Sequence, residues 1–409
     1  MRHHAPTPPP NVSPPAIAFA GSSTSQRSEL PSDSRILFHQ PTITGRELPH
    51  IADAINRSQV GEDGFFTRAC TEFLQDRFSI DTALMVNSCT AALEMAMTLC
   101  GVSAGDEVIM PSFTFVSCAN AVVKVGATPV FVDVRADTMN LDESLIEAAI
   151  TERTRAIMPV HYAGVSCEMD AICAIAAKHG LRVIEDAAQG VNSTYKGRPL
   201  GSIGDLAGFS FHDTKNISCG EGGALCINDS ELVERAEILR DKGTNRRQFW
   251  RGQVDKYTWV DVGSSYVLSE ISCAYLYGQL ESLDEIQKAR DAIYNSYREQ
   301  LAPLAAEGKI TLANVPADCT TNSHIFYLMV GEEHSRADLM DHLRARNVAT
   351  TFHFVPLHTS PMGTVLGRAS GDLPVTTDQS ARLLRLPMHL SLDEADIERV
   401  VSAVEEFFQ

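Results

Sequence analysis

The fold class is decided by one stretch, GDEVIMPSFTFVSCANAVVKVGATPVFVDV, which spans residues 105–134. It begins with the apolar run EVIM, continues through the helix-like run VSCANAVVKVG, and ends in a second apolar run, PVFVDV. Neither apolar run alternates with polar residues, so we expect two strands that are buried on both faces. Buried strands joined by a helix are typical of a mainly parallel sheet wrapped by helices, and the stretch therefore predicts an α/β fold.

The same alternation continues on both sides of this stretch. Further helices are expected at residues 90–101, 142–150 and 168–180, and further buried strands at 155–160, 181–187, 207–211 and 223–228. Beyond about residue 230 long helical patterns take over, and the C-terminal part mixes strands with helices. We expect a disordered Pro/Ser-rich extension at residues 1–35, a large domain at 36–265, and a connecting helix with a smaller α/β domain at 266–409.

Composition excludes several classes of function. The formal net charge of -18 makes nucleic acid and anionic membranes poor partners. No apolar run approaches the roughly 18 residues that a membrane span needs. The ten cysteines contain no CxxC pair, so we expect no metal site and interpret them as core thiols of a protein in the reducing cytoplasm.

Four chemical features lie at predicted strand ends or helix starts. Asp186 comes directly after a buried strand, and Lys215 follows the apolar run AGFSF. Phe115 follows EVIM, and the turn Ser88–Cys89–Thr90 opens a helix. Taken singly, each has an ordinary structural explanation as a cap, a core residue or a surface lysine. In a parallel sheet, however, ligands bind at the carboxyl ends of the strands, where these residues would meet.

Together these residues suit one ligand, pyridoxal 5'-phosphate (PLP). Amide groups and hydroxyls at a helix N-terminus hold a phosphate, and an aromatic face covers a flat heterocycle. A carboxylate keeps a pyridine nitrogen protonated, and a lysine forms a Schiff base with an aldehyde. This chemistry explains why Lys215 stands beside a run typical of a buried strand, because a lysine joined to an aldehyde carries no solvated ammonium.

Longer segments resemble the sugar aminotransferases of the DegT/DnrJ/EryC1/StrS family. The resemblance covers nearly all of the chain beyond the extension and is carried by VNSCTAALEMA, GDEVIMPSFTFVSCANAV, VIEDAAQGVNSTYKGRPLGSIGD, FSFHDTKNISCGEGGAL and FHFVPLH, among others. It implies the fold-type I architecture of PLP-dependent aminotransferases, with a mainly parallel seven-stranded sheet in the large domain and a smaller C-terminal α/β domain. The stretch GTNRRQFWRGQVDKYTWVDVGSSYVLSE is most similar to transaminases that form dTDP-4-amino-4,6-dideoxygalactose.

The resemblance implies a role for each matching residue. Lys215 matches the Schiff-base lysine, and Asp186 matches the partner of the pyridine nitrogen. The other implied cofactor residues are Gln189 near the ring hydroxyl, Phe115 stacked on the ring, and Ser210, Ser88, Cys89 and Thr90 at the phosphate.

Two positions depart from the family pattern. Cys89 stands where most members have glycine, which makes the approach of backbone to phosphate less certain. Ser265 stands where most members have asparagine, in a loop that reaches the neighbouring subunit's phosphate. The transaminases that form dTDP-4-amino-4,6-dideoxygalactose share both changes, which are therefore marks of that subgroup. Because the partner subunit carries the loop of Ser265 in relatives, the resemblance implies a homodimer with its active sites at the subunit interface.

The implied reaction moves an amino group from L-glutamate to dTDP-4-dehydro-6-deoxy-D-glucose, giving a dTDP-4-amino-4,6-dideoxy sugar. The residues expected on the substrate side are His161, Tyr162, Arg251 and His353, and Arg246 and Arg247 would join Arg251 around a diphosphate. A structural role remains an alternative for His161 and for His353, and the arginines could be a solvated face.

Three other functions remain open. The acceptor could be another keto sugar or a keto-cyclitol. A dehydratase of the same family is disfavoured, because those enzymes usually replace the lysine with histidine and Lys215 is present. A PLP-binding regulator without turnover is the third possibility.

Overall fold

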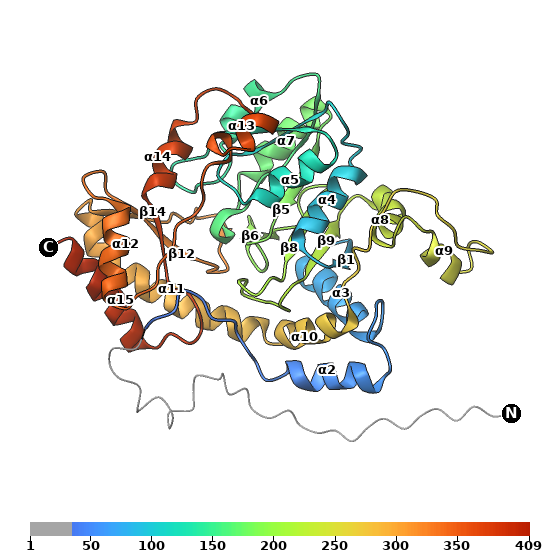
Figure 1. Cartoon of the computed structure of the whole chain (residues 1–409), viewed down its shortest axis with the longest axis horizontal. Helices are drawn as coiled ribbons and strands as arrows, with labels where there is room; N and C mark the ends of the chain where they lie inside the picture. The colour runs from blue at the N-terminus through green and yellow to red at the C-terminus, as the bar shows by residue number, and fades with distance from the viewer. Residues whose placement is uncertain (1–34) are drawn as a thin grey trace.

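The computed structural model describes residues 35–409, so the extension expected at residues 1–35 falls outside it except for its last residue. A sheet of eight strands lies at the centre, in the order β1-β9-β8-β5-β4-β2-β3-β13 (Figure 1). Its strands are β1 (Thr82–Val86), β2 (Glu107–Pro111), β3 (Thr128–Val132), β4 (Thr154–Ile157), β5 (Arg182–Asp186), β8 (Leu206–Ser210), β9 (Gly223–Ile227) and β13 (Arg368–Ala369). Strand β9 is antiparallel to both neighbours, and the other neighbouring pairs are parallel. The mainly parallel sheet is confirmed, and β13 adds an eighth strand to the seven expected.

Helices cover both faces of this sheet, as its apolar strands require. On β2, Val108 and Met110 pack into one apolar cluster, and Ile109 between them packs into another on the opposite face. The first face is covered by α4 (Cys89–Leu99), α5 (Val116–Lys124) and α8 (Val233–Arg240). The second face is covered by α3 (Phe65–Phe78), α6 (Ile146–Ala149), α7 (Met169–His179) and α10 (Glu270–Leu280), with α2 (Glu47–Asn56) packed on α10.

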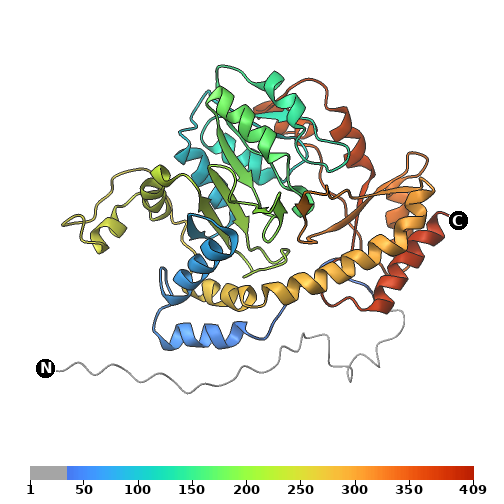
Figure 2. The ribbon, with the colours of Figure 1, turned by 180° about the vertical axis from the view of Figure 1, so that it is seen from behind.

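The C-terminal part forms a second layer at one side of the large sheet. Its three-stranded sheet is made of β10 (Ile310–Leu312), β12 (Phe326–Val330) and β14 (Leu383–Leu386). The helices of this part are α11 (Leu283–Ala306), α12 (Arg336–Ala345), α13 (Gly363–Leu366), α14 (Pro374–Arg382) and α15 (Glu394–Phe407). The long helix α11 runs from beneath the large sheet to this small sheet (Figure 2). A domain boundary near residue 265 stays a prediction.

Two smaller features complete the described chain. A minor sheet joins β6 (Thr194–Tyr195) to β7 (Arg198–Pro199) and β11 (Cys319–Thr320). Helix α9 (Arg246–Trp250) lies on an arm, residues 243–262, that projects away from the large sheet in both views (Figures 1 and 2). Within residues 35–409, no helix is long and apolar enough to cross a membrane. The same part of the chain has no cluster of three or more His, Cys, Asp or Glu side chains placed to hold a metal ion.

Candidate active site

A cavity of about 520 Å³ opens at the carboxyl ends of the parallel strands. Its volume lies in the range typical of small-molecule sites, about 300–1,000 Å³. Nine of the residues singled out from the sequence line it: Ser88, Cys89, Thr90, Phe115, Asp186, Gln189, Ser210, Lys215 and His353. They come from the ends of β1, β2, β5 and β8 and from the segment before β14, so the sheet topology brings together positions far apart in sequence.

One end of the cavity is the start of helix α4. Ser88 caps this helix, its Oγ accepting a hydrogen bond from the Ala91 amide at 3.1 Å. The Thr90 hydroxyl is hydrogen-bonded to that of Ser117 at 2.8 Å. Because the first amide groups of a helix have no partner within it, this turn presents donors and a positive dipole end to an anion.

Two glycines make room for this turn. A side chain on Gly223 of β9 would come within 2.5 Å of the Cys89 amide nitrogen, and one on Gly208 of β8 within 2.9 Å of the Cys89 Sγ. The Cys89 thiol therefore occupies space that Gly208 leaves free, and burial raises the thiol's pKa well above its usual value. The larger residue at the phosphate turn is thus accommodated by the strand behind it.

Asp186 ends strand β5 with its carboxylate fixed in place. Its Oδ1 accepts a hydrogen bond from the Ala188 amide at 3.0 Å, and its Oδ2 accepts one from the Cys118 thiol at 2.8 Å. Burial raises the pKa of Cys118, and the Asp186 charge adds to the effect, so the thiol stays a neutral donor. This second partner was not anticipated from the sequence.

Phe115 contributes an aromatic side chain to the wall of the cavity. It precedes helix α5, and its side chain is 58% exposed although it borders the cavity. A large aromatic face that the protein leaves uncovered suits stacking against a flat ring. On the other side, Gln189 is held by its Oε1, which accepts a hydrogen bond from the Ala163 amide at 2.8 Å.

Lys215 lies in the loop between β8 and β9. The loop is shaped by a turn in which the Lys215 amide donates to the His212 carbonyl at 2.9 Å. Burial lowers the pKa of the Lys215 amine, while the Asp186 carboxylate acts in the opposite direction. A partly desolvated amine near a carboxylate is poised to be neutral and nucleophilic, as a lysine that bonds to an aldehyde must be.

These residues fit PLP. The anion-binding turn at α4, the aromatic wall, the fixed carboxylate and the desolvated amine lie in one cavity, each at a different part of it. The phosphate, the ring face, the pyridine nitrogen and the aldehyde of PLP require these four partners.

His353 and Tyr162 are linked, but only His353 reaches the cavity. The Nδ1 of His353 is 3.3 Å from the Tyr162 hydroxyl, and its Nε2 accepts a hydrogen bond from Arg385. Burial lowers the pKa of His353 to about 2, with Arg385 adding to the effect, so the ring is neutral and carries its proton on Nδ1. Tyr162 is buried behind it and supports the wall rather than lining it.

The structure does not bring His161 to the cavity. Its ring is fully buried, and its Nε2 lies 2.9 Å from Glu185 Oε2. Successive strand residues point to opposite faces, so Glu185 and the adjacent Asp186 lead to different sides of the sheet. His161 therefore belongs to the core on the Glu185 side, which is the structural alternative that the sequence left open.

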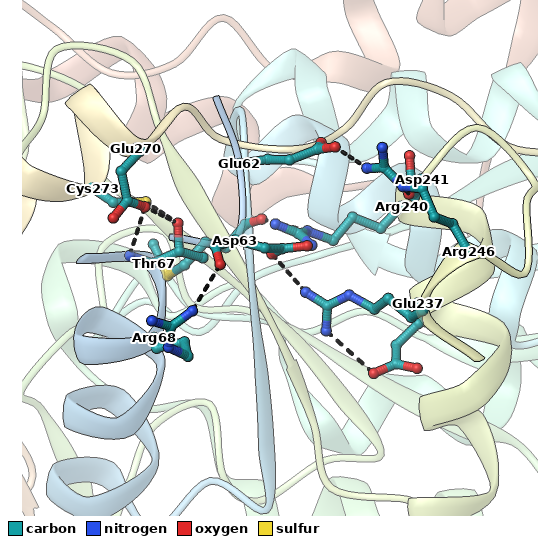
Figure 3. Close-up of polar contacts among 12 residues, drawn as sticks. Glu62, Asp63, Thr67, Arg68, Glu237, Arg240, Asp241, Arg246, Glu270 and Cys273 are labelled. Atoms are coloured by element: carbon teal, nitrogen blue, oxygen red, sulfur yellow. Dashed lines mark hydrogen bonds and ion pairs between the residues drawn. The ribbon is translucent and has the colours of Figure 1, made fainter. Parts of the chain in front are cut away.

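The basic residues near α9 are also kept away from the cavity. They belong to an arginine cluster, defined as Arg240, Arg246, Arg247 and Arg251. Figure 3 shows Arg240 and Arg246 of this cluster with the carboxylates around them. Arg247 Nη2 lies 2.6 Å from Asp63, and Arg251 Nη2 lies 2.7 Å from Glu237. The expected grouping of Arg246, Arg247 and Arg251 is therefore present, but acidic neighbours balance its charge.

Ser265 lies outside the cavity of its own subunit. It is exposed, and its carbonyl accepts a hydrogen bond from the Asn87 side chain at 3.2 Å, close to the Ser88 turn. A role for this residue in a neighbouring subunit's site needs a second copy of the chain.

Several cavity residues were missed from the sequence, including two basic residues near Lys215. Arg385 of β14 and His324, just before β12, both border the space around Lys215. His324 Nδ1 is 2.9 Å from Asn216 Oδ1, and burial lowers the pKa of His324 well below its usual value. A charged residue inside the apolar run LLRLP is the same signal that pointed to Lys215, so Arg385 could have been found.

The chain is similar to known proteins over most of its length. The model of the DegT/DnrJ/EryC1/StrS aminotransferase family matches residues 41–405. GDP-perosamine synthase of Caulobacter vibrioides is 36% identical over 385 residues, which cover 93% of this chain and 99% of that relative.

Solved structures agree as well. The putative sugar aminotransferase Spr1654 from Streptococcus pneumoniae, in its PLP form, has a TM-score of 0.83 at 26% identity, covering 91% of this chain and 99% of its own. DesI, solved in the presence of its TDP-sugar product, has a TM-score of 0.82 at 29% identity, covering 91% of this chain and 93% of its own. The fold expected from the sequence is confirmed.

Proposed function

Because the chain belongs to the DegT/DnrJ/EryC1/StrS aminotransferase family, we propose that it transfers the amino group of L-glutamate to dTDP-4-dehydro-6-deoxy-D-glucose. The product would be a dTDP-4-amino-4,6-dideoxy sugar. The chain is a PLP-dependent sugar aminotransferase, as the sequence predicted. The donor, the nucleotide and the sugar are our proposal. The observation that supports amino transfer is that the Lys215 amine lies in one cavity with Asp186 and the anion-binding start of α4.

Each residue has a separate task. Bound PLP supplies an electron sink for the charge that develops on the substrate carbon. The Lys215 amine would take the proton from the substrate carbon and return it. The Asp186 carboxylate, fixed by the Ala188 amide and the Cys118 thiol, would hold the pyridine nitrogen in its protonated form.

The remaining residues bind and orient. Ser88, Thr90 and Ser210 would hold the phosphate at the start of α4, with Cys89 as part of the turn, and Gln189 would lie near the ring hydroxyl. Phe115 would cover the ring and exclude water from one face. His353 would face the substrate from the small sheet, with Tyr162 fixing its ring.

A GDP-linked 4-keto sugar is the second candidate acceptor. The similarity to GDP-perosamine synthase over most of both chains favours it. DesI, whose structure was solved with a TDP-sugar product, favours the dTDP acceptor, as does the stretch at residues 243–270.

We propose a homodimer whose sites lie between subunits. The arm at residues 243–262 exposes a group of large apolar side chains, which monomers rarely leave uncovered: Phe249, Trp250, Tyr257, Trp259, Val260 and Val262. Ser265 follows this arm. Most family members have asparagine at this position, and the resemblance implies that it reaches the phosphate of the cofactor in the partner subunit. We expect Ser265 to act on the partner's cofactor through its hydroxyl.

We place the enzyme in the cytoplasm. All ten cysteines are free thiols, and most are buried among apolar side chains. Unpaired core thiols of this kind fit a reducing compartment.

One experiment tests the reaction. The purified protein with PLP and L-glutamate is incubated with dTDP-4-dehydro-6-deoxy-D-glucose and, separately, with a GDP-linked 4-keto-6-deoxy sugar, and NMR identifies any amino sugar. We expect conversion of the dTDP acceptor. Conversion of the GDP acceptor alone would select the second candidate, and conversion of neither would refute the proposed acceptor class.

A second experiment tests the shared site. Light scattering should give the mass of two chains. Mixing the inactive Lys215→Ala chain with a chain altered at the arm, Trp259→Ala with Ser265→Ala, should restore activity if one subunit completes the other's site. A monomer that turns over substrate would refute the dimer.

A further inference from the structure

Arg385 is a charged residue on a buried strand that faces the cavity of Lys215. Its place along β14 is fixed because its amide donates to the Thr351 carbonyl at 2.8 Å. Its Nη1 donates to His353 Nε2, and its guanidinium lies over the Phe38 ring, 4.8 Å from the centroid. The Nε atom is buried and has no hydrogen-bond partner within residues 35–409.

The described chain does not neutralise this charge. No carboxylate among residues 35–409 forms an ion pair with Arg385. Burial lowers the pKa of Arg385 to about 10, which leaves it charged at neutral pH. Its partner His353 is neutral, because its pKa is lowered to about 2. A buried charge without a counter-ion is strongly unfavourable, so the cavity is prepared for an anion at this point.

That anion is not the cofactor's phosphate. The phosphate site is expected at the start of α4, between Ser88 and Thr90, whereas Arg385 enters from the small sheet. Arg385 is close enough to Lys215 to lower the pKa of that amine. An anion on Arg385 would therefore lie beside the amine that exchanges protons with the substrate carbon.

We propose that Arg385 binds the α-carboxylate of the amino-acid donor. The inference rests on the proposed function, in which that donor is L-glutamate. Because Nη1 is held by His353, the opposite edge of the planar group, Nε with Nη2, is left to pair with two carboxylate oxygens. His353, fixed in turn by Tyr162, sets the angle of the guanidinium.

A phosphate of the sugar nucleotide is the competing occupant. In such a substrate the diphosphate is joined to C1, and the reacting ketone is at C4 on the far side of the ring. A group beside Lys215 is therefore better placed for the α-carboxylate, which is joined directly to the reacting carbon of the donor.

The test separates the two half-reactions of the PLP-loaded enzyme. For Arg385→Gln, we expect the half-saturating concentration of L-glutamate to rise by about 30-fold or more, since a two-point charged contact is lost. The reaction of the pyridoxamine form with the keto sugar should change by less than about threefold, because that substrate makes no such contact. Arg385→Lys keeps the charge but not the planar fork, and we expect a rise of about tenfold.

A binding measurement works without turnover. Glutarate, an unreactive dicarboxylate, is titrated into the loaded protein by calorimetry, and Arg385→Gln should weaken its binding by about tenfold or more. Arg382→Gln is the matched control, because Arg382 lies just before β14 and pairs with Asp378 outside the cavity. It should leave both measurements unchanged.

Each contrary result has a meaning. Equal losses in both half-reactions, or unaltered glutarate binding in Arg385→Gln, would overturn the inference. If Arg385→Gln does not fold, the two half-reactions and the glutarate titration are measured on Arg385→Lys, and those results test the inference. A wild-type protein that binds glutarate through Arg385 but converts no keto sugar would refute the proposed acceptor and leave this inference standing.

Discussion

The cavity and the arginine cluster differ in whether their positive side chains have carboxylate partners. In the cavity, Lys215 and Arg385 are surrounded by few acidic groups, and neither has a carboxylate in an ion pair among the described residues. In the arginine cluster, every guanidinium has one: Arg240 and Arg247 with Asp63, Arg251 with Glu237, and Arg246 with Asp241 and Glu62. Figure 3 shows Arg240 and Arg246 beside their carboxylates. The arginine cluster contains more positive groups, yet the positive charge without a carboxylate partner among the described residues lies in the cavity, on Arg385.

Whether a buried charge is paired indicates whether it serves the stability of the fold or the binding of a ligand. A buried, paired charge holds segments together, and losing one partner is costly. A buried charge without a partner in the protein marks the place of a ligand. Removing a residue from each region should therefore affect different quantities, activity in one and stability in the other.

The largest effect is expected from Lys215→Ala. Amino transfer should fall by about a thousandfold or more, because the group that moves the proton is lost. Thermal stability of the cofactor-free protein should not fall, since no ion pair is broken. Single-turnover kinetics and a melting curve measure the two quantities. Lys242→Ala, which removes an exposed lysine paired with Asp241, is the control and should change neither much.

Asp63→Ala tests how much the ion pairs of the arginine cluster contribute to stability. It leaves the buried Arg240 without its carboxylate, and we expect unfolding free energy to drop by about 3–5 kcal/mol. The kcat of the remaining folded protein should hold. Asp53→Ala removes an exposed pair with Arg57 and should cost less than about 1 kcal/mol. Similar losses for the two variants, measured by urea denaturation, would contradict the distinction.

Glu107 of β2 is a second example of a paired charge, because it forms an ion pair with Arg368 of the edge strand β13. Hydrogen bonds from Arg368 lower the pKa of Glu107 to about 2, although burial opposes them. A carboxylate with a depressed pKa stabilises the fold above its ordinary pKa, and this contribution is lost as pH falls towards 2. Glu107→Gln should cost about 3 kcal/mol at pH 7, and the gap to wild type should begin to close below about pH 4.5 and disappear only as pH falls through about 2. A gap as large at pH 3 as at pH 7 would show a packing effect instead.

The smallest effect is expected from Arg251→Gln. Its exposed pair with Glu237 should contribute less than about 1 kcal/mol to stability, and the KM for the sugar nucleotide should stay the same. A clear rise in that KM would instead mean that the arm delivers Arg251 to a neighbouring subunit. Such a result would restore the diphosphate site expected from the sequence.

The sequence predicted the parts of the site that local rules determine. Lys215, Asp186 and the Ser88 turn follow strands whose apolar runs are unambiguous, and parallel strands bring their carboxyl ends to one edge. His161 also follows a strand, but the direction of its side chain depends on the turn after β4 and on the buried Glu185. The Cys118 thiol beside Asp186 depends on how α5 packs over β5.

Other parts needed the folded chain. The pairing of Arg251 with Glu237 joins two helices whose relative position no local pattern specifies. Arg385 reaches the cavity because the small sheet is placed against the large one. The role proposed for Ser265 would depend on a second subunit, which a single sequence does not position.

The segment at residues 351–370 has a consequence for the size of the cavity. Its first residue is hydrogen-bonded to Arg385 on the small sheet, and the Ser370 amide is bonded to the Phe131 carbonyl on the large one. Between them, the Leu357 amide is bonded to the Ser112 carbonyl, just after β2. The two sheets are thus spaced by a strap of fixed contour length. We expect an insertion into this strap to change the spacing of the two sheets, and with it the size of the acceptor that the cavity admits.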